Sequence, residues 1–286
     1  VPTTSVSTIG TWQTSNFTAS FNDADNLGGS GLEKSYYQVI DYNGTEWRGN
    51  YTHGFFSDNF DVAIHPEWTQ KVGTWGINNN AIEQTDEVST AAANTNIYAS
   101  LTQNLSNRYL YNFKGKLEGA GTNRRAGFHF FCDAPDSVNR GNSYFVWFRL
   151  DNQAVQIYKT SYSGGVNVFG SPTYTAACNL TAGQWYDFKV IYDRITGKIT
   201  VYKDNSIIAT WTDPTPLSNG THISFRSGNC KWSLDEIKVY RSRPTASVSV
   251  SVGSGNANDV RYQNPNPTQF AAKVKSIVND SAGNLS

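Results

Sequence analysis

The chain has 286 residues, enough for one large domain or two smaller ones. Its 23 basic and 23 acidic residues balance, so no overall field favours nucleic acid or an acidic membrane surface. The sequence has no apolar run of the length that spans a membrane, which argues against membrane insertion. Charged residues make up only 16% of the chain and aromatic residues 14%, as is typical of all-β extracellular proteins. We therefore expect a secreted, periplasmic or cell-surface protein.

Residues 1–55 are expected to form about three strands, with an Asp- and Gly-rich loop at NDADNLGGSG. From residue 56 to residue 243, apolar and polar side chains alternate in short runs that Gly, Asn, Asp or Pro separates. The dipeptides Thr196-Gly197 and Asp204-Asn205 are expected to be hairpin turns. This pattern predicts a large sandwich or jelly roll, with almost no helix beyond single turns. Residues 244–286 add two or three strands.

The two end segments are each too short to bury a core. Together they amount to about 100 residues, the size of one immunoglobulin-like domain. We therefore predict a discontinuous immunoglobulin-like domain, formed by residues 1–55 and 244–286, with the sandwich of residues 56–243 inserted at a loop tip. The alternative is three separate pieces with flexible ends.

Several segments carry resemblances to known families. GSGLEKSYYQVIDYNGTEW and IVNDSAGNLS resemble the two ends of bacterial immunoglobulin-like repeats. FFSDNFDVAIHPEWTQKVGTWGINNNAIEQTD, GQWYDFKVIYDRITGKITVYKDN and SLDEIKVYR resemble concanavalin A-like (laminin-G-like) lectin/glucanase sandwiches. The whole chain is similar to a segment of secreted multidomain bacterial proteins labelled xanthan lyase. The resemblance implies a concanavalin A-like jelly roll inserted into an immunoglobulin-like sandwich, with other domains of the same polypeptide as partners.

The central strands of the predicted sandwich have two distinct faces. In NSYFVWFRLD, the side chains of Tyr144, Val146 and Phe148 are purely apolar and are expected to face the core. The same sorting of RRAGFHFFCD, AVQIYKT and HISFRSG leaves an outer face rich in arginine, histidine and aromatic residues. That face is predicted to carry Arg125, His129, Phe131, Phe145, Trp147, Arg149, Gln156, Tyr158, His222, Ser224 and Arg226. The resemblance suggests that these strands share the concave sheet.

Such a face suits polysaccharide binding. Aromatic rings stack on the apolar faces of sugars, and guanidinium groups bind hydroxyls or carboxylates. We expect Trp147 to stack on a sugar ring and the arginines to hold hydroxyls, or carboxylates if the glycan is acidic. The predicted glycan-binding residues are Arg125, His129, Trp147, Arg149, Tyr158, His222 and Arg226. The alternative is that Trp147 and Phe131 pack beneath loops and that the arginines pair with aspartates.

Catalysis is not expected from the carboxylates. A retaining glycosidase needs two carboxylates about 5 Å apart. The acidic pairs Asp86-Glu87 and Asp235-Glu236 are adjacent along strands, so their side chains point to opposite faces. The sequence also contains no G-x-S-x-G motif. We expect a non-catalytic carbohydrate-binding accessory module.

Two other functions remain open. A polysaccharide lyase acting on an acidic glycan such as xanthan would use His129 or Tyr158 as its base and Arg149 or Arg226 to hold the uronate. A structural spacer or adhesion module would bind no glycan.

No cofactor is required by these patterns. Some relatives hold a structural Ca²⁺ where the first and last strands of the sandwich pair, and Asp58 and Asp235 are the corresponding candidates. Cys132, Cys178 and Cys230 lack the spacing of metal ligands, so they are either buried thiols or one disulfide with one cysteine left over.

Overall fold

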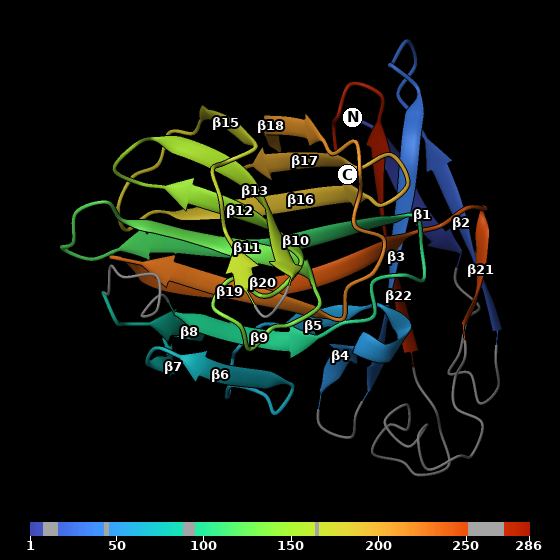
Figure 1. Cartoon of the computed structure of the whole chain (residues 1–286). Helices are drawn as coiled ribbons and strands as arrows, with labels where there is room; N and C mark the ends of the chain where they lie inside the picture. The colour runs from blue at the N-terminus through green and yellow to red at the C-terminus, as the bar shows by residue number, and fades with distance from the viewer. Residues whose placement is uncertain (8–16, 43–45, 88–94, 164–165, 251–271) are drawn as a thin grey trace. The chain divides into compact units, whose positions relative to one another are not determined.

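The structure is a computed structural model, and it describes six ranges of the chain (Figure 1). These are residues 1–7, 17–42, 46–87, 95–163, 166–250 and 272–286. They form β-strands joined by turns, which confirms the predicted all-β class. Within these ranges the helical structure is one turn of 3₁₀ helix, η1 (Tyr51–His53), and no helix is long and apolar enough to cross a membrane.

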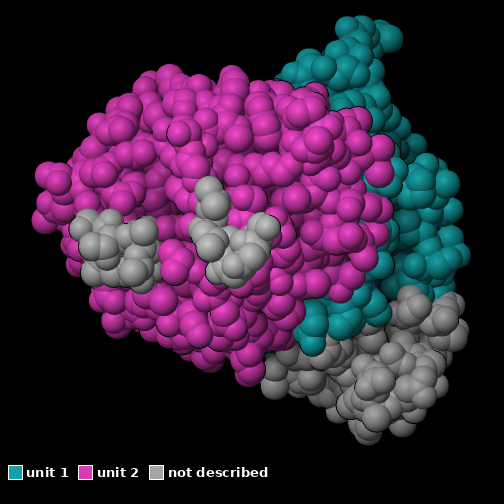
Figure 2. Space-filling view, in the orientation of Figure 1, with its two compact units in different colours: residues 1–58, 105–110, 238–286 teal, residues 59–104, 111–237 magenta. Residues whose placement is uncertain are grey.

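The described residues divide into two compact units (Figure 2). Unit 1 comprises residues 1–58, 105–110 and 238–286. Unit 2 comprises residues 59–104 and 111–237. The immunoglobulin-like identity of the end segments and the insertion boundaries at residues 56 and 243 stay predictions.

Unit 2 is a sandwich of two antiparallel sheets. The first sheet runs in the order β14 (Val166–Val168), β13 (Ala154–Ser163), β12 (Ser143–Arg149), β11 (Arg125–Cys132), β19 (His222–Gly228), β9 (Asn96–Ser100) and β6 (Trp68–Val72), with β15 (Tyr174–Ala177) beside β13. The second runs in the order β18 (Ser206–Thr212), β17 (Lys198–Lys203), β16 (Trp185–Asp193), β10 (Arg108–Glu118) and β20 (Lys231–Ser242), with β8 (Ala81–Gln84) on β20 and β7 (Trp75–Asn78) on β8. The last residues of β20 and the first of β10 belong to unit 1.

Aromatic rings fill the space between the two sheets of unit 2. The ring of Phe128 on β11 lies 5.1 Å from Tyr111 on β10. Phe148 on β12 lies 4.0 Å from Phe188 on β16, and Phe188 lies 5.7 Å from Phe113. All five side chains are buried. The residues predicted to face the core therefore do so, because alternate side chains of a strand lie on opposite faces of its sheet.

Unit 1 brings together the two ends of the described chain. One sheet has the order β1 (Thr3–Ser7), β2 (Phe17–Ala24) and β21 (Ser247–Val250). The long strand β3 (Leu32–Tyr42) pairs with β22 (Ala272–Asp280), with β4 (Trp47–Gly49) and with the end of β20, while β5 (Phe56–Asp58) also pairs with β20. The ladder of β3 and β22 sets Val39 opposite Val274. A small core of Phe21, Tyr37, Phe55 and their neighbours closes the unit.

Two-residue turns close two hairpins in the second sheet of unit 2. Asp204 and Asn205 join β17 to β18 with φ angles of 50° and 65°, as the sequence predicted. Asn79 and Asn80 join β7 to β8 with φ angles of 52° and 57°. Positive φ at both central residues matches the right-handed twist of the flanking strands, and Asn tolerates it better than most residues.

This turn geometry predicts the effect of a substitution at Asn80, whose side chain is exposed. Asn80→Val should lower the free energy of unfolding by about 1–2 kcal/mol, because a branched Cβ is strained at positive φ. Asn80→Gly is the matched control at the same position and should cause no loss. Urea denaturation measures both variants, and equal stability of the two would contradict the assigned turn.

Candidate functional site

The register of the eight-stranded sheet brings most of the predicted binding residues together. On β11, Gly127 lies opposite Trp147 of β12 on one side and Arg226 of β19 on the other. His129 lies likewise between Phe145 and Ser224. The prediction that these strands share one sheet is therefore correct. A Cβ on Gly127 would come within 2.1 Å of the Val146 carbonyl oxygen, so only glycine fits there.

The outer face of this sheet is covered, however, where Trp147 lies. Trp147 is only 3% exposed, and it packs with Phe145 and Tyr158 in a cluster separate from the core between the sheets. Phe169, from the connection after β14, covers this cluster with its ring 4.4 Å from that of Tyr158. The expectation of an open indole face that stacks on a sugar therefore differs from the structure. The indole is covered because the loop that carries Phe169 packs over it, and the alternation of residues along a strand gives no information about loop packing.

A second loop, residues 133–142 between β11 and β12, covers another part of the outer face. Its Pro135 carbonyl accepts a hydrogen bond from Asn96 Nδ2 at 2.9 Å. Its Arg140 is buried and donates to the Thr95 carbonyl at 2.7 Å and to Ser224 Oγ at 3.0 Å. These bonds hold the loop against β9 and β19.

His129 lies fully buried between these two coverings. Its ring stacks on Phe145 at 3.9 Å, and its Nδ1 is 3.1 Å from Ser143 Oγ. Burial, followed by the nearby positive charges of Arg140 and Arg226, lowers the pKa of His129 well below its ordinary value of 6.5. His129 is therefore neutral in the folded protein.

Arg226 is a cation enclosed by aromatic rings. Its guanidinium lies 5.7 Å from the Trp147 ring and 5.1 Å from the Phe169 ring, and it donates to Asn139 Oδ1 at 3.0 Å. Only 2% of the residue is exposed. Burial, followed by repulsion from Arg125, lowers the pKa of Arg226 to about 9.

Beside the covered cluster lies a polar strip formed by Arg125, Arg149 and Gln156, all of them partly exposed. Arg125 and Arg149 are directly opposed across β11 and β12. Arg149 donates to Gln156 Oε1 at 2.9 Å and to Asn123 Oδ1 at 2.5 Å. The guanidinium of Arg125 lies 5.7 Å from the Trp147 ring, so Trp147 supports the strip from below.

The other predicted residues lie apart from the strip or differ in orientation. His222, partly exposed, lies opposite Cys132 in the register and edge-on to Tyr98 at 5.6 Å, away from Trp147. Phe131 was expected on the outer face, and this is wrong. The ladder between β11 and β19 shifts after His129, and Phe131 has a φ of 56°, so its ring turns inward to lie 4.8 Å from Tyr192.

The described residues do not support the candidate calcium site. In unit 1, the Asp58 carboxylate lies 3.5 Å from the guanidinium of Arg48. In unit 2, Asp235 accepts a hydrogen bond from the Glu236 backbone N–H at 2.6 Å. No group of three or more His, Cys, Asp or Glu side chains suited to a metal occurs in the ranges that the structure describes.

The three cysteines are free thiols, and each is buried. Of the two alternatives that the sequence left open, the structure has the buried thiols. Burial raises the pKa of Cys178 to about 11 and that of Cys230 to about 12, so both stay protonated and unreactive at neutral pH.

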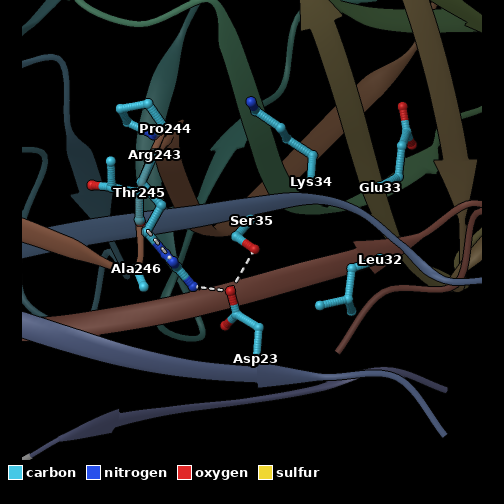
Figure 3. Close-up of a pocket in the computed structure, with 9 residues that line it drawn as sticks. All are labelled: Asp23, Leu32, Glu33, Lys34, Ser35, Arg243, Pro244, Thr245 and Ala246. Carbon is cyan, nitrogen blue, oxygen red and sulfur yellow. Dashed lines mark hydrogen bonds and ion pairs between the residues drawn. The ribbon is translucent and has the colours of Figure 1, made fainter.

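Unit 1 has a shallow pocket of about 270 Å³ (Figure 3). Its floor is an ion pair between Arg243 and Asp23, and Asp23 also accepts a hydrogen bond from Ser35 Oγ at 2.7 Å. The Arg243 guanidinium lies 4.0 Å from the Phe21 ring. Because Arg243 and Asp23 neutralise each other, we interpret this pocket as a structural junction between β2, β3 and the chain after β20.

Sequence reasoning missed Asn123, Asn139, Arg140 and Phe169, which position the arginines of the outer face. All four belong to loops or strand ends, where no alternation of apolar and polar residues assigns a side chain to a face. The only sequence signal was the presence of large or charged side chains in segments otherwise rich in Gly, Asn and Ser.

Comparison with known proteins supports the fold. No protein-family model matches the chain, and no curated protein matches it. The carbohydrate recognition domain of Emp47p has a TM-score of 0.51 at 8% identity, over 67% of this chain and 96% of that one. The potassium-bound form of the Emp46p carbohydrate recognition domain has a TM-score of 0.50 at 13% identity, over 67% and 98%. The chain has the lectin-like sandwich fold.

A third solved structure is the carbohydrate-binding module CBM66 from Bacillus subtilis. Its TM-score is 0.48 at 14% identity, over 60% of this chain and 93% of that one. At such identities the likeness concerns the fold alone, and function must come from the side chains.

The buried neutral His129 predicts a pH dependence of stability. The unfolded chain takes up a proton on this histidine below about pH 6.5, while the folded protein does not, so stability should fall as pH decreases from about 6.5 to 5 with a slope of up to about 1.4 kcal/mol per pH unit. His129→Gln should have a shallower slope. Urea denaturation across this pH range measures the slopes, and an unchanged slope in His129→Gln would contradict the assignment.

Proposed function

We propose that this chain is a non-catalytic polysaccharide-binding module of a larger secreted or cell-surface protein, and that unit 2 carries the binding face. The observation that supports it most is the polar strip of Arg125, Arg149 and Gln156 on a sheet of a lectin-like sandwich. Like charges directly opposite each other are unfavourable on an ordinary solvated sheet face, whereas this face carries opposed arginines over an indole ring.

In this proposal the strip binds the polymer through hydrogen bonds. Arg125 and Arg149 donate, and the Gln156 amide both donates and accepts. Trp147 acts indirectly, because its ring lies below Arg125 and restricts where that guanidinium points. His129 and Arg226 are buried, so they support the strip and do not contact the polymer. Tyr158 donates a hydrogen bond to Gln156 Oε1 at 3.1 Å. His222 would contact the polymer only beyond the strip.

Binding along so open a strip is expected to be weak for a single site. Affinity for a long polymer then comes from repeated or neighbouring domains of the same polypeptide, which raise the effective concentration of each site. Unit 1, proposed to be immunoglobulin-like and part of a protein of the xanthan-lyase-labelled kind, would act as a spacer. No metal ion is needed for this mode of binding.

A lyase is a weaker candidate because of where its bases would lie. A general base must come within hydrogen-bond reach of the proton that it removes. His129 is fully buried, and Tyr158 is 6% exposed beneath Phe169. Burial raises the pKa of Tyr158, which further opposes a basic phenolate. We therefore do not propose catalysis by either residue.

Affinity gel electrophoresis tests the proposed function on the full chain. Gels containing a neutral or an acidic polysaccharide, one polymer per gel, should retard the protein in at least one case. Gln156→Leu should weaken that retardation by about tenfold, because it removes a hydrogen-bonding group worth about 1–1.5 kcal/mol without changing net charge.

The matched control is Gln70→Leu, at an exposed position of β6 at the far edge of the same sheet. It should be retarded as strongly as the wild-type protein. The proposal would be refuted by the absence of retardation in every gel, or by equal losses in Gln70→Leu and Gln156→Leu.

A further inference from the structure

Two arginines of the outer face, Arg149 and Arg226, differ from other arginines of the chain in the groups that accept their hydrogen bonds. Arg124, the neighbour of Arg125 in sequence, forms an ion pair with Asp151 at 2.7 Å. Arg108 pairs with Glu33 at 2.7 Å, and Arg243 pairs with Asp23. Arg149 and Arg226 instead donate to the neutral oxygens of Gln156, Asn123, Asn139 and Val138. Among the described residues, neither forms an ion pair with a carboxylate.

The arginines of the outer face and of the loop that covers it lie next to one another. Arg125 is directly opposite Arg149 in the ladder. Arg125 and Arg226 both lie 5.7 Å from the same Trp147 ring. Arg226 and Arg140 both donate to the Val138 carbonyl, at 3.4 Å and 2.6 Å. The four guanidinium groups therefore form a continuous row of positive charge. The row runs from the polar strip into the covered part of the face, in the order Arg149, Arg125, Arg226 and Arg140.

This row carries an energetic cost in the free protein. Like charges directly opposite each other across two strands destabilise the sheet. Burying a guanidinium without a counter-charge costs more, and Arg226 Nε has no hydrogen-bond partner among the described residues. Burial lowers the pKa of Arg125 the most, and repulsion from Arg149 lowers it further. An anion at the exposed end would relieve this repulsion.

The geometry of the exposed end favours a planar anion. Hydrogen bonds that the Arg149 guanidinium donates to the neutral amide oxygens of Gln156 and Asn123 hold it in place without cancelling its charge. The Trp147 ring fixes Arg125 beside it. Two guanidinium groups, each with N–H donors in one plane, match the two oxygens of a carboxylate.

We propose that the polar strip binds acidic polysaccharides, with Arg125 and Arg149 holding a carboxylate group of a uronic acid or similar sugar. This inference rests on the proposed polysaccharide-binding function and names the class of polymer. Arg226 and Arg140 do not touch the polymer, and they strengthen binding by adding positive potential from beneath.

The direct test compares a carboxylated polymer with its carboxyl-reduced form. Isothermal titration calorimetry of the full chain with alginate or xanthan should give measurable binding, and reduction of the carboxylates to hydroxyls should weaken it at least about tenfold. Affinity for the carboxylated polymer should also fall as NaCl rises from about 0.05 M to about 0.5 M. Dextran sulfate, whose anionic groups are sulfate esters and not carboxylates, should bind less tightly than alginate at equal salt.

Variants assign the effect to the two arginines. Arg125→Gln and Arg149→Gln should each lose about tenfold or more in affinity for alginate. Arg125→Lys keeps the charge but loses the planar fork, and it should fall between wild type and Arg125→Gln. Lys198→Gln is the matched control, since it removes one exposed positive charge from β17 of the other sheet of unit 2, and its affinity should be unchanged. Circular dichroism melting curves verify that each variant is folded.

The outcomes separate this inference from the function on which it rests. Equal affinity for the native and carboxyl-reduced polymers would overturn the carboxylate inference while leaving polysaccharide binding intact. Tighter binding of dextran sulfate would replace carboxylate by sulfate as the ligand and would also overturn it. Equal losses in Lys198→Gln and Arg125→Gln would point to net charge alone and refute the assigned site. No binding to any polymer would refute both proposals.

Discussion

The burial of the Arg226 guanidinium among aromatic rings constrains the whole outer face of the eight-stranded sheet. A desolvated cation needs compensation, and here it comes from the rings of Trp147 and Phe169 and from the Asn139 amide. Phe169 and Asn139 belong to two different loops. The same cation therefore fixes both loops over the sheet, and beyond these loops the strip of Arg125, Arg149 and Gln156 is partly exposed.

The bare backbone of Gly127 makes this arrangement possible. It lies between Trp147 and Arg226 in the ladder, and any side chain there would collide with Val146 and Phe145. The Trp147 indole on β12 and the Arg226 guanidinium on β19 therefore meet over Gly127 of β11, the strand that lies between them. The guanidinium groups of buried Arg226 and partly exposed Arg125 both lie against this indole ring, so the two positive charges interact.

Much of this could be predicted from strand periodicity. Alternation along β11, β12, β13 and β19 correctly separated the core face from the outer face, since neighbouring side chains of a strand lie on opposite sides. The prediction failed for Phe131, because a bulge inserts an irregular step that alternation cannot detect. It also could not foresee that Phe169 would cover Trp147, because a loop contact depends on tertiary packing.

Fold similarity and side-chain chemistry contribute differently to the functional account. The lectin-like sandwich establishes a scaffold that hosts many activities. The burial of His129 and Tyr158 and the exposure of the arginine pair are what favour binding over catalysis on this scaffold.

The most direct measurement is an NMR titration of the arginine Nε–Hε resonances of the ¹⁵N-labelled protein with alginate oligosaccharides. The account predicts that the resonances of Arg125 and Arg149 shift progressively with ligand, while those of Arg124 and Arg243, which are paired with Asp151 and Asp23, stay in place. Unchanged Arg125 and Arg149 resonances, together with shifts elsewhere in the chain, would contradict the claim that this face binds the polymer.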